Sequence, residues 1–121
     1  MTTTTKTTPD ISTLSSAIVA RDADGVLAWY RDDATLTIID RDHPPAAPQV
    51  FSGAEQIAAY YRDICGRNME HEVRDAVVTD GGLAYAQHCR YPDGTAVVCV
   101  TVATTVDGKI HSQTAVQAWD A

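Results

Sequence analysis

The side chains best suited to chemistry in this sequence are a histidine and an arginine that share one face of a predicted strand. His88 and Arg90 lie two positions apart in a strand-like segment, so they point to the same side. An imidazole carries a proton near neutral pH, and a guanidinium beside it favours the neutral ring, which can act as a base. Arg90 could also hold negative charge on a substrate oxygen. The alternative is an imidazole that only makes hydrogen bonds among strands.

Three other side chains are candidates for proton transfer or ligand contact. Asp40 could act as a base, although Asp42 and His43 beside it also fit a solvated turn. Tyr61 could donate a hydrogen bond to a carbonyl oxygen, or it could fill the core with its hydroxyl satisfied. His71 opens a strand-like segment and is a further candidate for contact with a ligand.

The sequence offers no pattern for a metal or an organic cofactor. The four histidines lack the paired spacing of a zinc site, and the three cysteines, an odd number, lack metal-ligand spacing. There is no glycine-rich phosphate loop and no nucleophile elbow. We therefore expect neither a metal nor a cofactor, and we expect the thiols to be reduced.

Length, composition and charge limit the kinds of protein this can be. In a chain of 121 residues, we expect a disordered threonine-rich tail at 1–9 and a single domain at 10–121. The formal net charge of −7 argues against nucleic acid and anionic membrane surfaces as partners. No apolar run is long enough to cross a bilayer, and no signal peptide opens the chain. These features predict a cytoplasmic protein.

The hydrophobic period changes from helical to strand-like along the chain. Asp10 can cap one helix and either Asp22 or Asp24 a second, and Ser52 with Glu55 forms a capping-box pattern for a third. The predicted strands are residues 35–39, 70–79, 83–91, 95–106 and 110–119. A helical first half and an antiparallel meander in the second half predict an α+β fold, with helices on one face of a curved sheet.

The run WYRDDATLTII at 29–39 ends a helix in two aspartates and passes directly into a strand. After a proline-rich loop, FSGAEQI at 51–57 opens the next helix. This order resembles the nuclear transport factor 2-like superfamily, which includes ketosteroid isomerases and SnoaL-like polyketide cyclases. The resemblance implies a cone-shaped fold in which three N-terminal helices pack on a strongly bent antiparallel sheet. It also implies a small apolar ligand at the open end and a homodimer through the outer sheet face.

The resemblance further implies which positions should carry chemistry. Counted without gaps, the general base of the ketosteroid isomerases falls on Ile38, their proton-donating acid on Val102 and their oxyanion tyrosine on Leu14. None of these three side chains can transfer a proton. Tyr61 matches a tyrosine that hydrogen-bonds into the isomerase active site. The catalytic candidates are therefore His88, Asp40 and Tyr61.

The same register assigns side chains to the two faces of the sheet. The predicted ligand-contacting residues are Tyr30, Ile38, His71, Arg90, Val102, Gln113 and Gln117. The outer face should carry small or apolar side chains through which we expect the homodimer to form. These are Val97, Cys99, Thr101 and Ala103 on one strand and Ser112, Thr114, Val116 and Ala118 on the next.

Two functions of different kinds follow. The first is a small-molecule enzyme of the isomerase, cyclase or dehydratase type, which applies acid–base chemistry to an apolar, oxygenated substrate. The second is a non-catalytic ligand-binding or dimerisation module of the same fold. The missing acids at the usual positions favour the module, and the polar side chains retained in the predicted cavity favour the enzyme.

Overall fold

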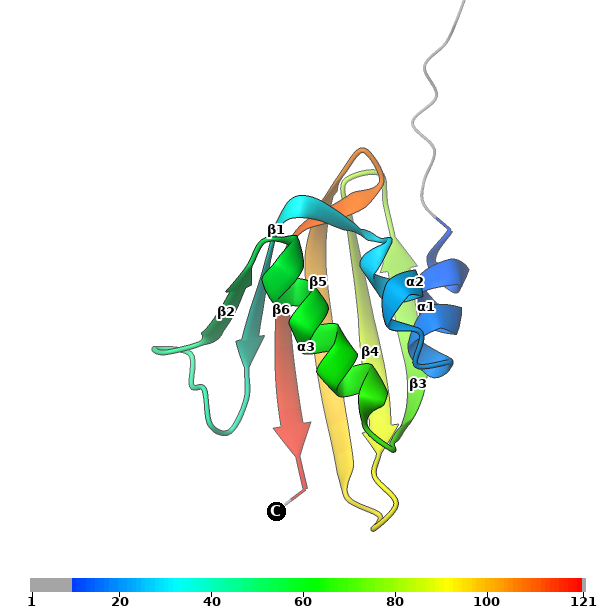
Figure 1. Cartoon of the computed structure of the whole chain (residues 1–121), viewed down its shortest axis with the longest axis vertical. Helices are drawn as coiled ribbons and strands as arrows, with labels where there is room; N and C mark the ends of the chain where they lie inside the picture. Colours follow the sequence, from blue (N-terminus) through cyan, green and yellow to red (C-terminus); the bar gives the residue numbers. More distant parts are fainter. Residues whose placement is uncertain (1–9, 121) are drawn as a thin grey trace, which may run out of the picture.

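The computed structural model describes residues 10–120, which form three helices and six strands (Figure 1). The helices are α1 (Ile11–Val19), α2 (Ala23–Leu27) and α3 (Ala54–Gly66). The strands are β1 (Tyr30–Ile39), β2 (Gln49–Ser52), β3 (Glu70–Val78), β4 (Gly82–Arg90), β5 (Ala96–Val106) and β6 (Lys109–Trp119). The predicted tail at 1–9 lies outside the described residues, as does residue 121.

The strands within residues 10–120 form one bent sheet in the order β2-β1-β6-β5-β4-β3. Neighbouring strands are antiparallel except β1 and β6, which run parallel. Figure 1 shows the sheet curling around α3, while α1 and α2 lie near β3 and β4. The predicted α+β cone with three helices is therefore confirmed, and the one parallel pair makes the sheet mixed.

Two of the three helices begin as predicted. Asp10 and Asp22 cap α1 and α2, because each carboxylate accepts a backbone N–H of the first turn. The capping box predicted for α3 is wrong. Gly53 is the N-cap residue, with φ of 86°, so Ser52 lies one residue too early to cap the helix. The N–H of Ser52 donates instead to Oε1 of Gln56 at 2.8 Å.

The core lies between the concave face of the sheet and the three helices. Its most deeply buried aliphatic side chains are Leu14, Val26, Leu36, Ile38, Ile57 and Ile110. Full burial of one such side chain is worth about 1.5–3 kcal/mol. Because Ile57 projects from the first turn of α3 and is 0% exposed, it anchors the start of this helix to the sheet.

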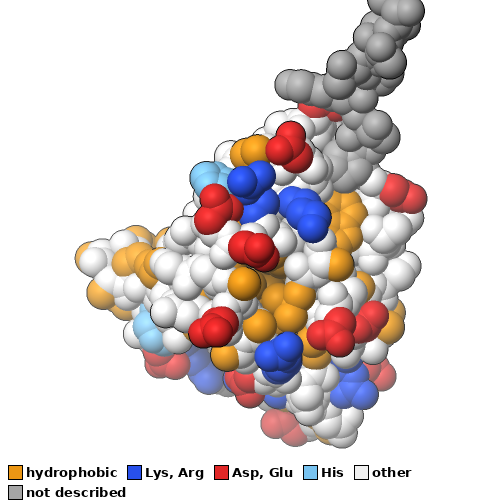
Figure 2. Space-filling model, turned by 45° about the horizontal axis from the view of Figure 1, so that its top comes forward, with side chains coloured by type: hydrophobic (Ala, Val, Ile, Leu, Met, Phe, Trp, Pro, Cys, Tyr) orange, Lys and Arg blue, Asp and Glu red, His pale blue; other side chains and the backbone are white. Residues whose placement is uncertain are grey.

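The surface on the helix side is mixed in character. Figure 2 shows acidic and basic side chains interspersed on the face that it presents, with hydrophobic side chains reaching the surface between them. Such scattered apolar exposure is ordinary for a folded domain. None of the described helices is long and apolar enough to cross a membrane.

A bulge in β6 determines which side chains of the sheet face the core. An unbroken hairpin between β5 and β6 would pair Val102 with Gln113 and place both inside the cone. In the structure His111 is an extra residue in β6, and Gln113 pairs with Ala103 instead. The pairs on either side of the bulge are Thr104 with Ser112 and Thr105 with Ile110. Gln113 is therefore buried, whereas Val102 is 62% exposed on the outer face.

The bulge also reverses the predicted faces of β4 and β5. His88 pairs with Val98 on the outer face, and Arg90 lies on that face as well, so their predicted place inside the cone is wrong. The predicted interface set Val97, Cys99, Thr101 and Ala103 is buried inside. The outer face of β5 carries Val98, Val100, Val102 and Thr104 in its place. On β6, the outward set Ser112, Thr114, Val116 and Ala118 lies as predicted.

We expect Ile57→Ala to lower the free energy of unfolding by about 2–5 kcal/mol, because the change leaves a cavity under α3. Urea denaturation measures this effect. Arg62→Ala, at an exposed position of the same helix, is the control and should change stability by less than about 0.5 kcal/mol. Equal effects of the two variants would contradict the placement of α3.

Candidate functional site

A cavity of about 500 Å³ lies between α3, the loop after β1 and the inner faces of β4, β5 and β6. Its apolar wall includes Ile38, Phe51, Ile64, Met69 and Val97. Hydrophobic walls with a few converging polar groups are the usual form of a small-molecule site. The chemistry available here therefore depends on which polar side chains reach this space.

A buried imidazole lies on the wall of the cavity. His71 of β3 is 9% exposed, and its Nδ1 lies 3.1 Å from Sγ of Cys89, its pairing partner on β4. Burial, and to a smaller extent the positive charge of Arg21, lowers the pKa of His71. Burial raises the pKa of Cys89 to about 11. Both groups are therefore uncharged at neutral pH, and the imidazole is in the form that can accept a proton.

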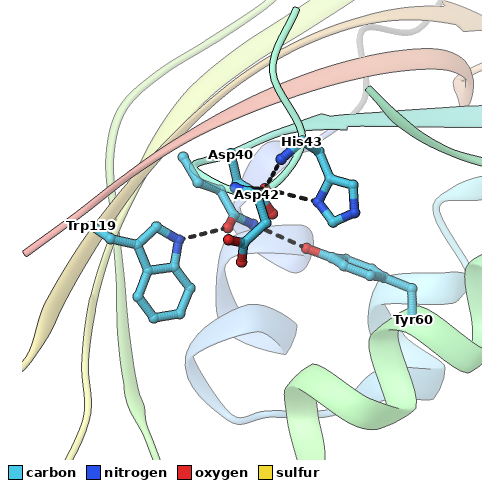
Figure 3. A network of polar contacts seen from close by, with 6 residues as sticks. Asp40, Asp42, His43, Tyr60 and Trp119 are labelled. Atoms are coloured by element: carbon cyan, nitrogen blue, oxygen red, sulfur yellow. Dashed lines mark hydrogen bonds and ion pairs between the residues drawn. The ribbon is translucent and has the colours of Figure 1, made fainter. Parts of the chain in front are cut away.

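Tyr60 of α3 is linked to β6 by a chain of hydrogen bonds along the cavity wall (Figure 3). Nε1–H of Trp119 donates to Oε1 of Gln117 at 3.1 Å, and Nε2 of Gln117 donates to the Tyr60 hydroxyl at 3.4 Å. Burial raises the pKa of Tyr60, so the phenol keeps its proton. Among the described residues no acceptor pairs with that proton, which leaves it available to a ligand.

Asp40 also lines the cavity, and its carboxylate is already engaged in hydrogen bonds (Figure 3). Its Oδ1 accepts the backbone N–H groups of Asp42 and His43 at 2.9 and 2.8 Å, and Nδ1–H of the His43 ring at 2.8 Å. Burial by itself raises the pKa of Asp40, but these hydrogen bonds outweigh it and hold the pKa below its ordinary value. Such a carboxylate is a weak base near neutral pH and serves to hold the turn.

Aromatic rings and charges of both signs also line the cavity. The guanidinium of Arg41 lies 4.7 Å from the centre of the Trp119 ring, which stacks on Tyr91 with ring centres 5.9 Å apart. Arg67 donates to the Tyr91 hydroxyl at 2.9 Å and pairs with Asp63 at 2.7 Å. The cavity wall therefore includes a flat aromatic surface in addition to its aliphatic side chains.

The inner end of the cone is closed by a network of buried hydroxyl and amide groups. The Tyr61 hydroxyl donates to that of Tyr30 at 2.5 Å, and Tyr30 donates to Oε1 of Gln113. Nε2 of Gln113 donates to the Thr101 hydroxyl at 3.1 Å. The direction of these hydrogen bonds follows because Oε1 of Gln113 can only accept, so Tyr30 must donate to it and Tyr61 must donate to Tyr30. Burial is the main cause that raises the pKa of Tyr30 and of Tyr61, so the Tyr61 proton stays committed to Tyr30.

The structure brings several of the sequence-predicted site residues to one place. Those on the cavity wall are Ile38, Asp40, His71 and Gln117. Tyr61 and Gln113 line a smaller space of about 30 Å³ behind it, and Tyr30 is buried beside them. The two spaces adjoin each other, since Tyr60, His71 and Gln87 line both of them.

The prediction that His88, Arg90 and Val102 face the cavity is wrong, because the bulge in β6 turns them outward. Sequence reasoning missed other polar and sulfur-bearing residues that line the cavity, among them Tyr60, Gln87, Cys89, Cys99 and Trp119. The alternation of Gln87 and Cys89 is as regular as that of His88 and Arg90. Only the register of the neighbouring strands distinguishes the two sets.

Within residues 10–120, no cluster of three or more His, Cys, Asp or Glu side chains is placed to bind a metal ion. The three cysteines are free thiols, with Cys89 and Cys99 buried and Cys65 partly buried. The groups that can do chemistry in the cavity are thus the imidazole of His71, the Tyr60 hydroxyl and the buried thiols.

Comparison with known proteins places this geometry in a family. A model of the SnoaL-like domain matches residues 12–113 of the chain. No curated protein matches the chain in sequence. Similar solved structures share its fold at low sequence identity, which limits that likeness to the fold.

Three of these structures illustrate the likeness. An NTF2-like protein of unknown function from Cytophaga hutchinsonii is 14% identical with a TM-score of 0.69, over 88% of this chain and 95% of that one. A protein with a ketosteroid isomerase-like fold from Catenulispora acidiphila, in complex with trimethylamine, is 18% identical with a TM-score of 0.64. The match covers 90% of this chain and 85% of that one. The epoxide hydrolase/cyclase-like enzyme SalBIII, described for pyran ring formation in the polyether salinomycin, is 18% identical with a TM-score of 0.68. The match covers 89% of this chain and 87% of that one.

The family model covers most of the chain, and the solved structures share its three helices on a curled sheet. The protein therefore belongs to the SnoaL-like domain family and has the nuclear transport factor 2-like fold.

Proposed function

We propose that this protein is a small-molecule enzyme of the isomerase, cyclase or dehydratase type, which applies acid–base chemistry to an apolar, oxygenated substrate in the cone-shaped cavity. The observation that carries this proposal is the neutral imidazole of His71 on the wall of that cavity. Among the described residues Nε2 of His71 has no hydrogen-bond partner, so this nitrogen is free to exchange a proton with a ligand. His71 replaces His88 as the catalytic candidate, because His88 lies on the outer face.

Tyr60 supplies the second group that this chemistry needs. Removal of a proton next to a carbonyl requires a base and a donor to the oxygen that becomes negative. The Tyr60 hydroxyl adjoins the same cavity with its proton unshared, and Gln117 holds its oxygen. In the proposed reaction His71 takes a proton from carbon and returns it elsewhere, while Tyr60 stabilises the oxygen. The name of SalBIII, an epoxide hydrolase/cyclase-like enzyme of the same fold, supports this class of reaction.

A non-catalytic ligand-binding module is the second candidate, and the inner network favours it. Tyr61 and Gln113 are hydrogen-bonded to other protein groups, and Asp40 is held in its turn. None of these side chains is poised to transfer a proton to a ligand. On this alternative the cavity binds an apolar compound, and His71 only lines its wall.

The proposal includes a cytoplasmic location and a homodimer. Three free thiols support a reducing compartment. For the dimer, the support is the apolar outer face of the sheet, where Val100 pairs with Val116 and the two side chains are 50% and 47% exposed. Val102 and Ile39 extend the same patch. Contiguous apolar patches of this kind mark interaction sites, and a twofold axis lets one patch cover its own copy.

Turnover should depend on His71 and binding should not. Trp29→Phe leaves Trp119 as the one tryptophan, so quenching of its fluorescence reports apolar ring compounds that enter the cavity. For a compound that binds and is converted, His71→Gln should lower turnover at least about 100-fold, the usual contribution of a general base. Mass spectrometry of the products measures conversion.

His88→Gln is the matched control, and it should retain full turnover because His88 lies on the outer face. Full turnover by His71→Gln would remove His71 from the mechanism. If compounds quench Trp119 fluorescence but the protein with both histidines intact never converts them, the result would favour the non-catalytic ligand-binding module.

The neutral state of His71 should also appear in the pH dependence of stability. Its folded-state pKa is below the ordinary value of 6.5, so the unfolded chain binds more protons between the two values. The contribution of neutral His71 to the free energy of unfolding is therefore fully present above about pH 6.5. It is lost as the pH falls toward the folded-state pKa. His71→Gln should therefore flatten the fall in stability on acidification, as measured by urea denaturation between pH 8 and 5. Val19→Thr, at an exposed position of α1, neither adds nor removes a titratable group and should leave the slope unchanged.

The proposed dimer should depend on the outer sheet face. Light scattering should give the unmodified protein twice the mass of one chain at micromolar concentration. Val100→Arg should give a folded monomer, because it places a charge in the centre of the patch. Val19→Arg, at an exposed position of α1, should leave the dimer intact. A monomeric unmodified protein would reject the dimer.

A further inference from the structure

The cavity wall holds a thiol and an imidazole in direct contact. Cys89 of β4 and His71 of β3 are opposite each other in the antiparallel ladder, so backbone pairing holds both side chains on the inner face. Their Sγ and Nδ1 atoms lie 3.1 Å apart. Both side chains line the cavity, and they are 7% and 9% exposed. A nucleophile and a base within hydrogen-bond reach form the minimal arrangement for covalent chemistry.

The other two cysteines lack this arrangement. Cys99 lines the same cavity from β5, and its thiol is associated with Thr101 rather than with an imidazole. Cys65 lies on α3, and burial raises its pKa. Cys99 is thus a natural control for cavity access, and it differs from Cys89 in the missing imidazole.

We propose that Cys89 adds covalently to α,β-unsaturated carbonyl compounds that enter the cavity, with His71 carrying the proton. This proposal rests on the proposed function in one respect, namely that an apolar ligand enters the cavity. Sγ of Cys89 bonds to the β carbon of the ligand while the thiol proton passes to Nδ1 of His71. The Nε2 proton of the imidazole then passes to the α carbon. The carbon–carbon double bond becomes single, charge and protons balance, and no oxidant is required.

The role of the imidazole follows from the burial of the thiol. Burial raises the pKa of Cys89 to about 11, so at pH 7 only about one thiol in ten thousand is ionised. Attack by free thiolate is therefore slow. A thiol that transfers its proton to a neighbouring nitrogen during attack avoids this limit. Nε2 of His71 has no hydrogen-bond partner among the described residues, so the second proton can be delivered to the ligand.

The adduct can be tested in Cys65→Ser protein, which retains Cys89 and Cys99 and lacks the more accessible thiol. The probe is cyclohexenone, a small cyclic enone, followed by intact mass and peptide mapping at pH 7.5. We expect one adduct, at Cys89, and none at Cys99. Cys89→Ser should abolish the adduct, and His71→Gln should slow its formation at least about tenfold. Circular dichroism and thermal unfolding check that these variants fold.

The pH dependence of the rate gives a second test that needs no His71 variant. Proton transfer to neutral His71 predicts a rate that levels off between pH 7 and 9, because the imidazole is already neutral there. A rate that rises tenfold per pH unit over this range would indicate free thiolate and overturn the proposal. An adduct at Cys99 in the folded protein would also overturn the proposal. So would a folded protein that forms no adduct at Cys89 while the urea-unfolded protein does.

These outcomes are separate from those of the proposed function. Quenching of Trp119 and conversion of a ligand without an adduct at Cys89 would reject the covalent chemistry and leave the acid–base enzyme standing. An adduct at Cys89 without turnover of any cavity ligand would support the covalent site and weaken the enzyme proposal.

Discussion

The backbone pairing of β6 is the constraint on which the rest of the cavity depends. This strand has a parallel partner in β1 and an antiparallel partner in β5. Its extra residue, His111, shifts the ladder by one position, and β4 follows because it pairs with β5. The shift turns Val102 and His88 to the outer face, and it turns Cys89 to the inner face. Neither function nor assembly can be assigned until this register is known.

The polar groups inside the cone serve two different purposes. A buried polar group without a partner costs about 1–3 kcal/mol, so the inner network of Tyr30, Tyr61 and Gln113 is stable only because its members satisfy one another. It closes the narrow end of the cone and keeps the hydroxyl protons of Tyr30 and Tyr61 within the network. In the large cavity, the hydroxyl proton of Tyr60 and Nε2 of His71 have no partner among the described residues. These two groups are therefore the ones placed to exchange a proton with a ligand.

Burial and hydrogen bonding act in opposite directions on the two candidate bases. At His71 burial dominates and lowers the pKa, so the ring is neutral and can accept a proton at physiological pH. At Asp40 three hydrogen bonds outweigh burial, so the carboxylate stays ionised and binds protons weakly. Cys89, buried against His71, stays a neutral thiol. The uncharged imidazole and thiol therefore suit contact with an apolar ligand.

The sequence by itself determined the fold class and most of the elements, although it missed β2 and assigned Tyr30 to Asp33, the first part of β1, to the end of a helix. The caps Asp10 and Asp22, and the change of hydrophobic period, act between residues close together in the chain, so local patterns reveal them. Only the tertiary structure decided which side chains meet in the cavity. His71 and Cys89 are 18 residues apart and meet through strand pairing. Because side chains alternate with period two, the single extra residue in β6 exchanges the inner and outer sets, and no local pattern marks it.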